Sequence, residues 1–145
     1  VKAGQGNYTV VFHGNGATSG NMKNQTMGIG VSTRINKITF SRNGYTFAGW
    51  SMDKKGTGDL FSNNQNVKNL SEVDGDKITL YAQWKVKEYN INYILNGGTN
   101  NSKNPKTYTI NTSKIVLAAP SRNGYGFMGW YKDKSLKKHV SKDMV

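Results

Sequence analysis

The fold of this chain is decided by the stretch from Ser41 to Trp50, S-R-N-G-Y-T-F-A-G-W, which has a near-copy, S-R-N-G-Y-G-F-M-G-W, from Ser121 to Trp130. Eight of the ten positions are identical, and the two copies are 80 residues apart. Repetition of a sequence at a long, fixed spacing indicates one structural unit used more than once. A chain of 145 residues has room for two small units of this length, so we expect two related modules.

Each copy of the repeated stretch reads as a turn followed by a strand. An Asn-Gly pair, which favours tight turns, opens each copy, and residues 45–50 and 125–130 then alternate with the period of two that strands require. In the first copy, regular alternation puts Tyr45 and Phe47 on one face and Trp50 on the other. Because both faces carry bulky side chains, we expect a central strand, with the glycine before the tryptophan leaving room for a neighbour.

The rest of the chain predicts further short strands joined by turns. Alternating β-formers indicate strands at 8–12, 29–35, 37–40 and 77–84 in the first copy and at 89–93, 108–110, 114–117 in the second. Val67, Leu70 and Val73 recur every third residue and predict one short helical turn. The expected fold class is therefore α+β, and mostly β.

The repeat also sets the expected domain boundaries. We expect a Gly-rich linker at 1–7, a first module at 8–84, a short linker at 85–88 and a second module at 89–145. Four residues form no flexible tether, so the modules are expected in a restricted, roughly end-to-end arrangement. The second copy lacks a counterpart of the closing strand at 77–84, so we expect an incomplete module whose open edge is available for self-association. The chain reads as an internal piece of a longer protein.

Composition limits the function. The net charge is +12, with seventeen Lys against three Arg, which suits anionic partners such as a cell surface or an acidic polysaccharide. The scarcity of arginine disfavours nucleic acid. Cysteine is absent, and no apolar stretch approaches the length of a membrane span, so no membrane insertion is expected of this segment. No nucleophile–base pair or metal-ligand set recurs in both copies, so we expect no enzyme, no cofactor and no metal.

One cluster of charged residues is a candidate binding site. Five lysines near the end of the chain could attract teichoic acid, acidic glycans or sulfated polysaccharide, or could simply form a solvated loop: Lys132, Lys134, Lys137, Lys138 and Lys142. The histidines, His13 and His139, lie in different modules and do not suggest a zinc site. Asp74 and Asp76 flank a glycine in what reads as a solvated turn rather than a calcium loop.

Aromatic residues at repeated positions predict the core. We expect a structural core that contains Tyr8, Tyr45, Phe47, Trp50, Tyr81, Trp84, Tyr89, Tyr125, Phe127 and Trp130. The tryptophans could instead form a platform on which sugar rings stack, and burial decides between the two roles. Arg42 and Arg122 precede identical turns, where they could bind an anion or could pack along the sheet and donate to turn carbonyls.

Taken in order, the motifs resemble a known family. Y-T-V-V-F with an Asn-Gly turn, then R-N-G-Y-T-F-A-G-W, then L-Y-A-Q-W resembles the Listeria–Bacteroides repeat, also called the internalin B-repeat family, of bacterial surface proteins. The resemblance covers residues 8–84 as a whole repeat and 89–145 as part of one. It implies tandem β-grasp-like modules in secreted, often wall-attached proteins, with no shared enzymatic activity. A stalk or spacer role that includes protein interaction, and adhesion to an anionic glycan or cell-wall polymer, are the two functions it leaves open.

Overall fold

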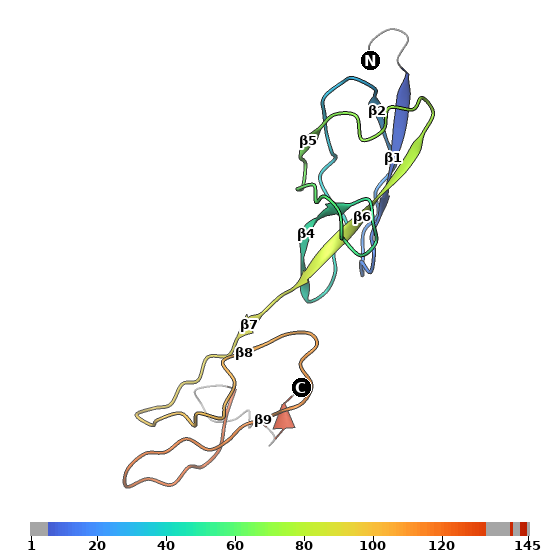
Figure 1. The fold of residues 1–145 in the computed structure, drawn as a ribbon. Coiled ribbons are helices and arrows are strands. Elements are labelled where there is room, and N and C mark those ends of the chain that lie inside the picture. Colours follow the sequence, from blue (N-terminus) through green and yellow to red (C-terminus); the bar gives the residue numbers. More distant parts are fainter. Residues whose placement is uncertain (1–5, 133–139, 141–142, 145) are drawn as a thin grey trace. The chain divides into compact units, whose positions relative to one another are not determined.

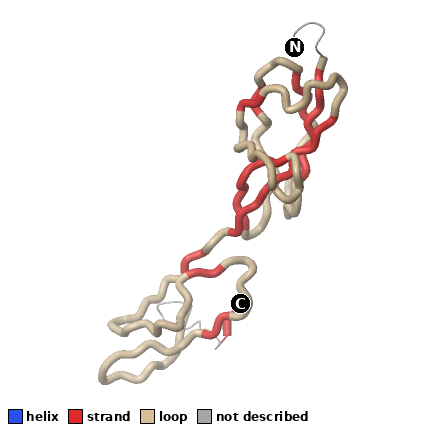
Figure 2. Tube along the Cα trace, in the orientation of Figure 1, coloured by secondary structure: helices blue, strands red, loops and turns tan. Residues whose placement is uncertain are grey.

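The computed structural model describes residues 6–132, 140 and 143–144, and the chain forms two compact units, Val1–Val86 and Lys87–Val145 (Figure 1). None of the described residues is helical (Figure 2), so the expected α+β class is wrong in its helical part. At the predicted helical turn, Val67 is instead part of a strand, and Val73 is 64% exposed. The left-handed backbone of Asn69 (φ 55°) interrupts any helix between them.

A four-stranded sheet forms the centre of the first unit. Its strands are β1 (Asn7–His13), β2 (Gln25–Gly28), β4 (Tyr45–Ser51) and β6 (Lys77–Val86). The spatial order is β2-β1-β6-β4, in which β1 and β6 are parallel and the other neighbours are antiparallel. The alternation of the sequence in β1 turns Tyr8, Val10 and Phe12 into the core while the residues between them stay more exposed.

Several strands are shorter than the sequence predicts. The expected strand at 29–35 is only β3 (Thr33–Arg34), which pairs with β5 (Asn66–Val67), and residues 37–40 form no strand. The reason is that these backbone groups bond to side chains and loops: Ile35 N donates to Gln65 O over 2.9 Å, and Ile38 N to Asn63 Oδ1 over 2.9 Å.

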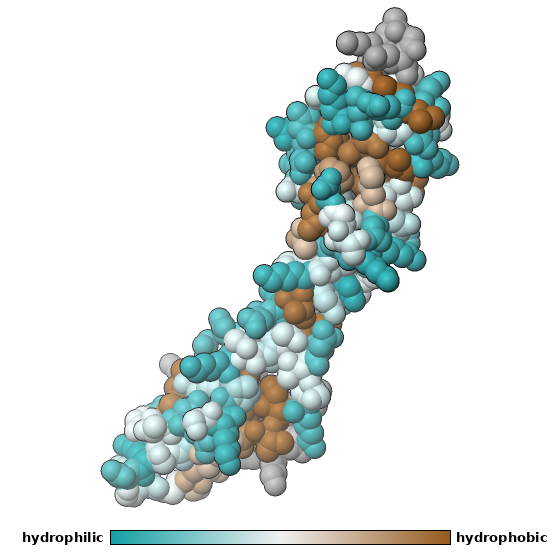
Figure 3. All heavy atoms as spheres, in the orientation of Figure 1, coloured by the Kyte–Doolittle hydropathy of each residue, from teal (hydrophilic) through white to brown (hydrophobic). Residues whose placement is uncertain are grey.

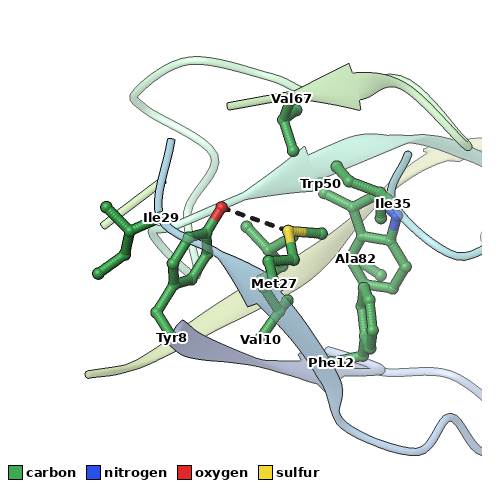
Figure 4. Packing of buried hydrophobic residues seen from close by; sticks show 10 residues of the cluster. Tyr8, Val10, Phe12, Met27, Ile29, Ile35, Trp50, Val67 and Ala82 are labelled. Atoms are coloured by element: carbon green, nitrogen blue, oxygen red, sulfur yellow. Dashed lines mark hydrogen bonds between the residues drawn. The ribbon is translucent and has the colours of Figure 1, made fainter. Parts of the chain in front are cut away.

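Trp50 lies at the centre of the core, where its side chain is completely buried. Its ring centroid is 5.0 Å from that of Phe12, 5.1 Å from that of Phe47 and 6.4 Å from that of Phe40. Around these rings pack the aliphatic residues of the sheet and loops, as Figure 4 shows. At the far end of the cluster, the Tyr8 hydroxyl donates to the Met27 sulfur over 3.3 Å. The repeated tryptophan is thus the anchor of a core.

A β-bulge explains how Phe47 and Trp50 come to share one face. The pairing of β4 with β6 passes from Phe47↔Trp84 directly to Gly49↔Gln83, which leaves Ala48 as an extra, exposed residue. The bulge brings Trp50 to the side of Phe47 instead of the opposite side. In the sheet, β4 pairs with β6 alone and lies at the edge, so the expectation of a central strand is wrong.

The second unit keeps the aromatic geometry of the first with far less sheet. Its paired strands are β7 (Tyr89–Asn90) with β8 (Thr107–Tyr108) and β9 (Ile115–Val116) with β10 (Asp143–Met144). Phe127 and Trp130 lie 5.2 Å apart at 64°, against 5.1 Å and 63° for Phe47 and Trp50. Gly129 has a φ of 140°, against 142° for Gly49.

In the second unit, residues 125–130 form no strand, although one was expected there. The strand expected at 89–93 is reduced to β7. The reason is the lack of a partner. In the first unit β6 pairs with both β1 and β4, whereas no strand among the described residues of the second unit takes that position. Strand backbone groups need such a neighbour to complete their hydrogen bonds.

The junction between the units is shorter than expected. β6 runs through to Val86 and β7 begins at Tyr89, so only Lys87 and Glu88 lie between the two strands. The expected linker at 85–88 is therefore half strand. The division into units falls between Val86 and Lys87.

Candidate functional site

The predicted lysine cluster lies mostly outside the described residues. Lys132 is exposed, at the end of the continuously described range 6–132. Lys134, Lys137, Lys138 and Lys142 fall on residues that the structure does not describe. The cluster therefore stays a prediction.

The residues predicted for the core occupy three kinds of environment. Tyr8 and Trp50 are fully buried. Six residues are half-buried, of which Phe47 and Trp84 pack against the core of the first unit; the others are Tyr45, Tyr81, Tyr89 and Trp130. Tyr125 and Phe127 do not match the expectation, since they are 66% and 44% exposed. Their first-copy counterparts are covered by β6, where Tyr45 pairs with Val86 and Phe47 with Trp84.

Burial also decides what the tryptophans can do. No face of Trp50 is open to a sugar ring, because the side chain is wholly enclosed. The Trp84 indole N–H donates to the Gly14 carbonyl over 2.9 Å, and its ring lies 5.9 Å from that of Phe47. Trp84 thus ties β6 to the turn that follows β1, which is a structural role.

Arg42 and Arg122 make the same packing contact in the two units. Each guanidinium lies 3.8 Å from the ring centroid of the tyrosine three residues later, a cation–π stack. Arg122 also donates through Nη1 to the carbonyl of Asn96 over 3.0 Å. For Arg122 this confirms the prediction of a side chain that packs and donates to a turn carbonyl, a role that holds the Asn-Gly turn against the repeated stretch.

The isolated titratable residues of the first unit stabilise turns by accepting hydrogen bonds. The Nδ1 atom of His13 accepts from Asn15 N over 3.0 Å, and Asp74 Oδ1 accepts from Asn7 N over 3.0 Å. Asp76 accepts from Ser71 Oγ over 2.6 Å and from Lys77 N over 2.9 Å. His139 lies outside the described residues, and within the described part of the chain no three His, Asp or Glu residues gather into a metal-binding group.

Asp53 organises the loop that follows β4. Hydrogen bonds from the Thr57 side chain first, and then from the backbone N–H groups of Lys55 and Thr57, hold the pKa of the Asp53 carboxyl below its ordinary value. The loop is fastened to β6 as well, because Gln83 Nε2 donates to the Asp53 carbonyl over 3.2 Å. This network shapes the turn.

A groove in the second unit has a volume of about 850 Å³. It lies between segments 91–96 and 125–132, and Val140 contributes to its lining. Two rings at the groove, those of Tyr93 and Trp130, are 5.5 Å apart. Burial raises the pKa of Tyr93, whose hydroxyl donates to the Pro105 carbonyl over 2.7 Å.

Apolar side chains rim this groove and reach solvent. Ile94 is 73% exposed, Tyr125 66% and Met128 89%. In the space-filling view, hydrophobic atoms lie at the surface of the second unit (Figure 3). Segments 91–96 and 125–132 correspond in sequence to β1 with its turn and to β4, the two strands between which β6 lies in the first unit. The groove therefore takes the place of β6.

A short all-β unit, used twice in one chain and built around one tryptophan-centred aromatic cluster, defines a tandem β-sheet repeat module. Comparison with known sequences identifies the family of this repeat. The chain belongs to the Listeria-Bacteroides repeat domain family, whose model matches residues 8–83 and 89–144.

Three curated relatives place this repeat in longer proteins. A Gly-rich membrane protein of Evansella cellulosilytica is 32% identical over 89% of this chain and 14% of its own length, and a second membrane protein of that organism is 29% identical over 88% and 17%. Internalin H of Listeria monocytogenes is 31% identical over 88% of this chain and 21% of its own length. The chain thus spans about a fifth or less of each relative.

No solved structure matches the chain with statistical significance. The described residues include no helix long and apolar enough to cross a membrane.

Proposed function

We propose that this chain is a non-catalytic repeat module of a bacterial cell-surface protein and that it acts as a stalk or spacer. The observation that carries the proposal is the junction of two residues, Lys87 and Glu88, between β6 and β7. A spacer must limit the swivelling of successive modules, and so short a connection between two strands leaves little backbone freedom. The names of the relatives, two membrane proteins and an internalin, support a place in the cell envelope.

The roles of the carboxylates support a non-catalytic module. The chain has only eight Asp and Glu residues. Asp53 accepts a hydrogen bond from a backbone N–H of its own turn, and Asp74 and Asp76 accept from the first residues of β1 and β6, so these oxygens hold loops in place. General acid–base chemistry needs carboxylates that face a substrate instead.

The spacer function is tested by measuring how the two units tumble. Nitrogen-15 relaxation gives a rotational correlation time for each unit, and we expect one common value in the natural chain. Inserting about ten Gly and Ser residues between Lys87 and Glu88 should give each unit its own, shorter value, because such a linker behaves as a flexible coil. Independent tumbling in the natural chain as well as in the insertion variant refutes the spacer.

The basic composition favours a second candidate, an adhesive module for an anionic glycan or cell-wall polymer. The net charge is +12, and Lys132, which precedes the other lysines of the predicted cluster in the sequence, is exposed. Contacts of this kind weaken as salt screens them. Retention on immobilised heparin and on wall teichoic acid, followed over a salt series, tests this candidate: absence of retention even at low salt rules it out.

A further inference from the structure

We propose that Asn43 and Asn123 are sites of spontaneous deamidation, and that the fold protects Asn15 from the same reaction. Such a modification is independent of the spacer function. All three asparagines precede a glycine, and two of them lie in the two copies of the repeated stretch.

Deamidation begins within the chain, when the backbone nitrogen of the next residue attacks the side-chain carbonyl carbon of the asparagine. The new bond between this nitrogen and Cγ closes a succinimide ring, the bond from Cγ to the amide nitrogen breaks, and ammonia leaves with the proton of the attacking nitrogen. Water then opens the ring at either carbonyl and gives aspartate or isoaspartate. No enzyme is needed, because both reacting groups belong to one molecule, and a following glycine leaves the attacking nitrogen unhindered.

The turn of the repeated stretch requires this glycine. Gly44 and Gly124 both have a φ of 80°, a backbone conformation that other residues rarely adopt. In each unit, the N–H of the tyrosine after the glycine donates to the carbonyl of the arginine before the asparagine, over 3.1 and 3.0 Å, which closes the same four-residue turn. The residue that shapes the turn is therefore also the one that exposes the reactive nitrogen.

The side chains of Asn43 and Asn123 are free to rotate. Both residues are exposed, and neither side-chain amide makes a hydrogen bond to another described residue. The backbone N–H of Asn43 donates to Thr18 Oγ1 over 2.9 Å, a contact that fixes the backbone of the turn and not the side chain. Cγ can therefore turn toward the glycine nitrogen without the loss of a side-chain hydrogen bond.

Asn15 also precedes a glycine, but its side chain is held in place. Its Nδ2 donates to the Ala82 carbonyl of β6 over 2.8 Å and to the Lys54 carbonyl over 3.1 Å. This nitrogen is the one that leaves in deamidation, and Cγ reaches the Gly16 nitrogen only by moving away from both acceptors. Asn15 is also half-buried, whereas Asn43 is exposed. Deamidation of Asn15 therefore requires local opening of the fold.

Deamidation changes the turn of the repeated stretch in two ways. Either product places a carboxylate next to Arg42, where the natural chain has a neutral amide. Isoaspartate also carries the main chain through the side-chain carbon, which adds a methylene to the turn that the hydrogen bond between Arg42 and Tyr45 closes. The cation–π stack of the same two residues, at 3.8 Å, spans this turn as well. We expect the lengthened turn to lose the hydrogen bond.

The test incubates the folded full chain at mildly alkaline pH and follows each of the three asparagines by peptide mapping with mass spectrometry. Enzymatic methylation of isoaspartate identifies the product. Conversion at Asn43 and at Asn123 should be at least about tenfold faster than at Asn15. The same chain unfolded in guanidinium chloride is the control: the hydrogen bonds of Asn15 are absent there, so its rate should rise to that of the other two.

Asn43→Asp is the matched reference for the effect on the turn, because it has the charge of the product with an ordinary backbone. Its Tyr45 amide should stay as protected from hydrogen exchange as in the natural chain, whereas the form with isoaspartate at position 43 should lose that protection. Equal protection in the two forms contradicts the effect on the turn.

Three results overturn the proposal. They are conversion of Asn15 as fast as that of Asn43 in the folded chain, no conversion at Asn43 or Asn123, and a rate difference that persists in the unfolded chain. The last result would assign the difference to the neighbouring sequence and not to the fold.

Discussion

Replacing Trp50 by Ala should remove the centre of the core in the first unit. The side chain is 0% exposed and meets three aromatic rings at centroid distances of 5.0, 5.1 and 6.4 Å. Truncation of a buried Trp to Ala typically costs about 3–5 kcal/mol, as lost transfer free energy plus the cavity left behind. Because Trp50 also loses three ring contacts, we expect the upper part of that range, which is a large share of the free energy of unfolding of a small domain.

The same substitution at Trp130 tests the reasoning within one molecule. Trp130 is only half-buried and has two ring neighbours, Phe127 and Tyr93, so Trp130→Ala should cost clearly less than Trp50→Ala. Trp50→Phe should also lower the free energy of unfolding only a little, by about 1 kcal/mol. The Trp50 indole N–H is buried without a hydrogen-bond partner, so its removal offsets part of the lost contact. Met52→Ala, at a side chain 46% exposed, is the neutral control.

The assay must report on each unit separately, since two units need not unfold in one step. Amide cross-peaks of β1 and β6, followed through a urea titration, give the free energy of unfolding of the first unit, and those of 91–96 report on the second. A Trp50→Ala loss below about 1 kcal/mol, or equal losses at Trp50 and Trp130, contradicts the assignment of Trp50 as the core anchor.

Three further changes probe the turns and the bulge. Gly49→Ala should destabilise the first unit by about 1–3 kcal/mol, because φ is +142° there and a Cβ atom would lie 3.2 Å from the Phe61 carbonyl oxygen; an unchanged urea midpoint would contradict the bulge. The hydrogen bond from Thr57 and its neighbours lowers the pKa of Asp53 below 3.8, so this carboxylate stabilises the fold above that pH and loses its effect as the pH falls through the lowered value. Asp53→Asn should therefore lower the free energy of unfolding at neutral pH and weaken its dependence on pH in the acid range. An NMR titration that places the Asp53 pKa at or above 3.8 would refute this role of Asp53. Arg122→Ala should cost the second unit about 0.5–1 kcal/mol through loss of the cation–π stack, measured by hydrogen exchange at the adjacent turn.

Local patterns predicted the parts of this fold that depend on local physics. The alternation in β1 and at 77–84 correctly indicated strands, because the period of two follows from backbone geometry alone. The Asn-Gly signals at 15–16 and 96–97 do carry left-handed backbone in the structure, which those residue types tolerate. The apolar triplet at 67–73 misled, because a spacing of three among Asn-rich neighbours is too weak to form a helix without a packing partner.

The sequence by itself determined that one module is used twice and that its tryptophans repeat, because both statements need only a comparison of the chain with itself. Tertiary structure decided where each tryptophan points. The extra residue at Ala48 in the pairing of β4 with β6 is a property of two strands together, and it alone moves Trp50 onto the face of Phe47. Burial likewise depends on the neighbouring strand: Tyr45 and Phe47, which pair with β6, are half-buried, whereas the identical residues Tyr125 and Phe127 of the second unit are exposed.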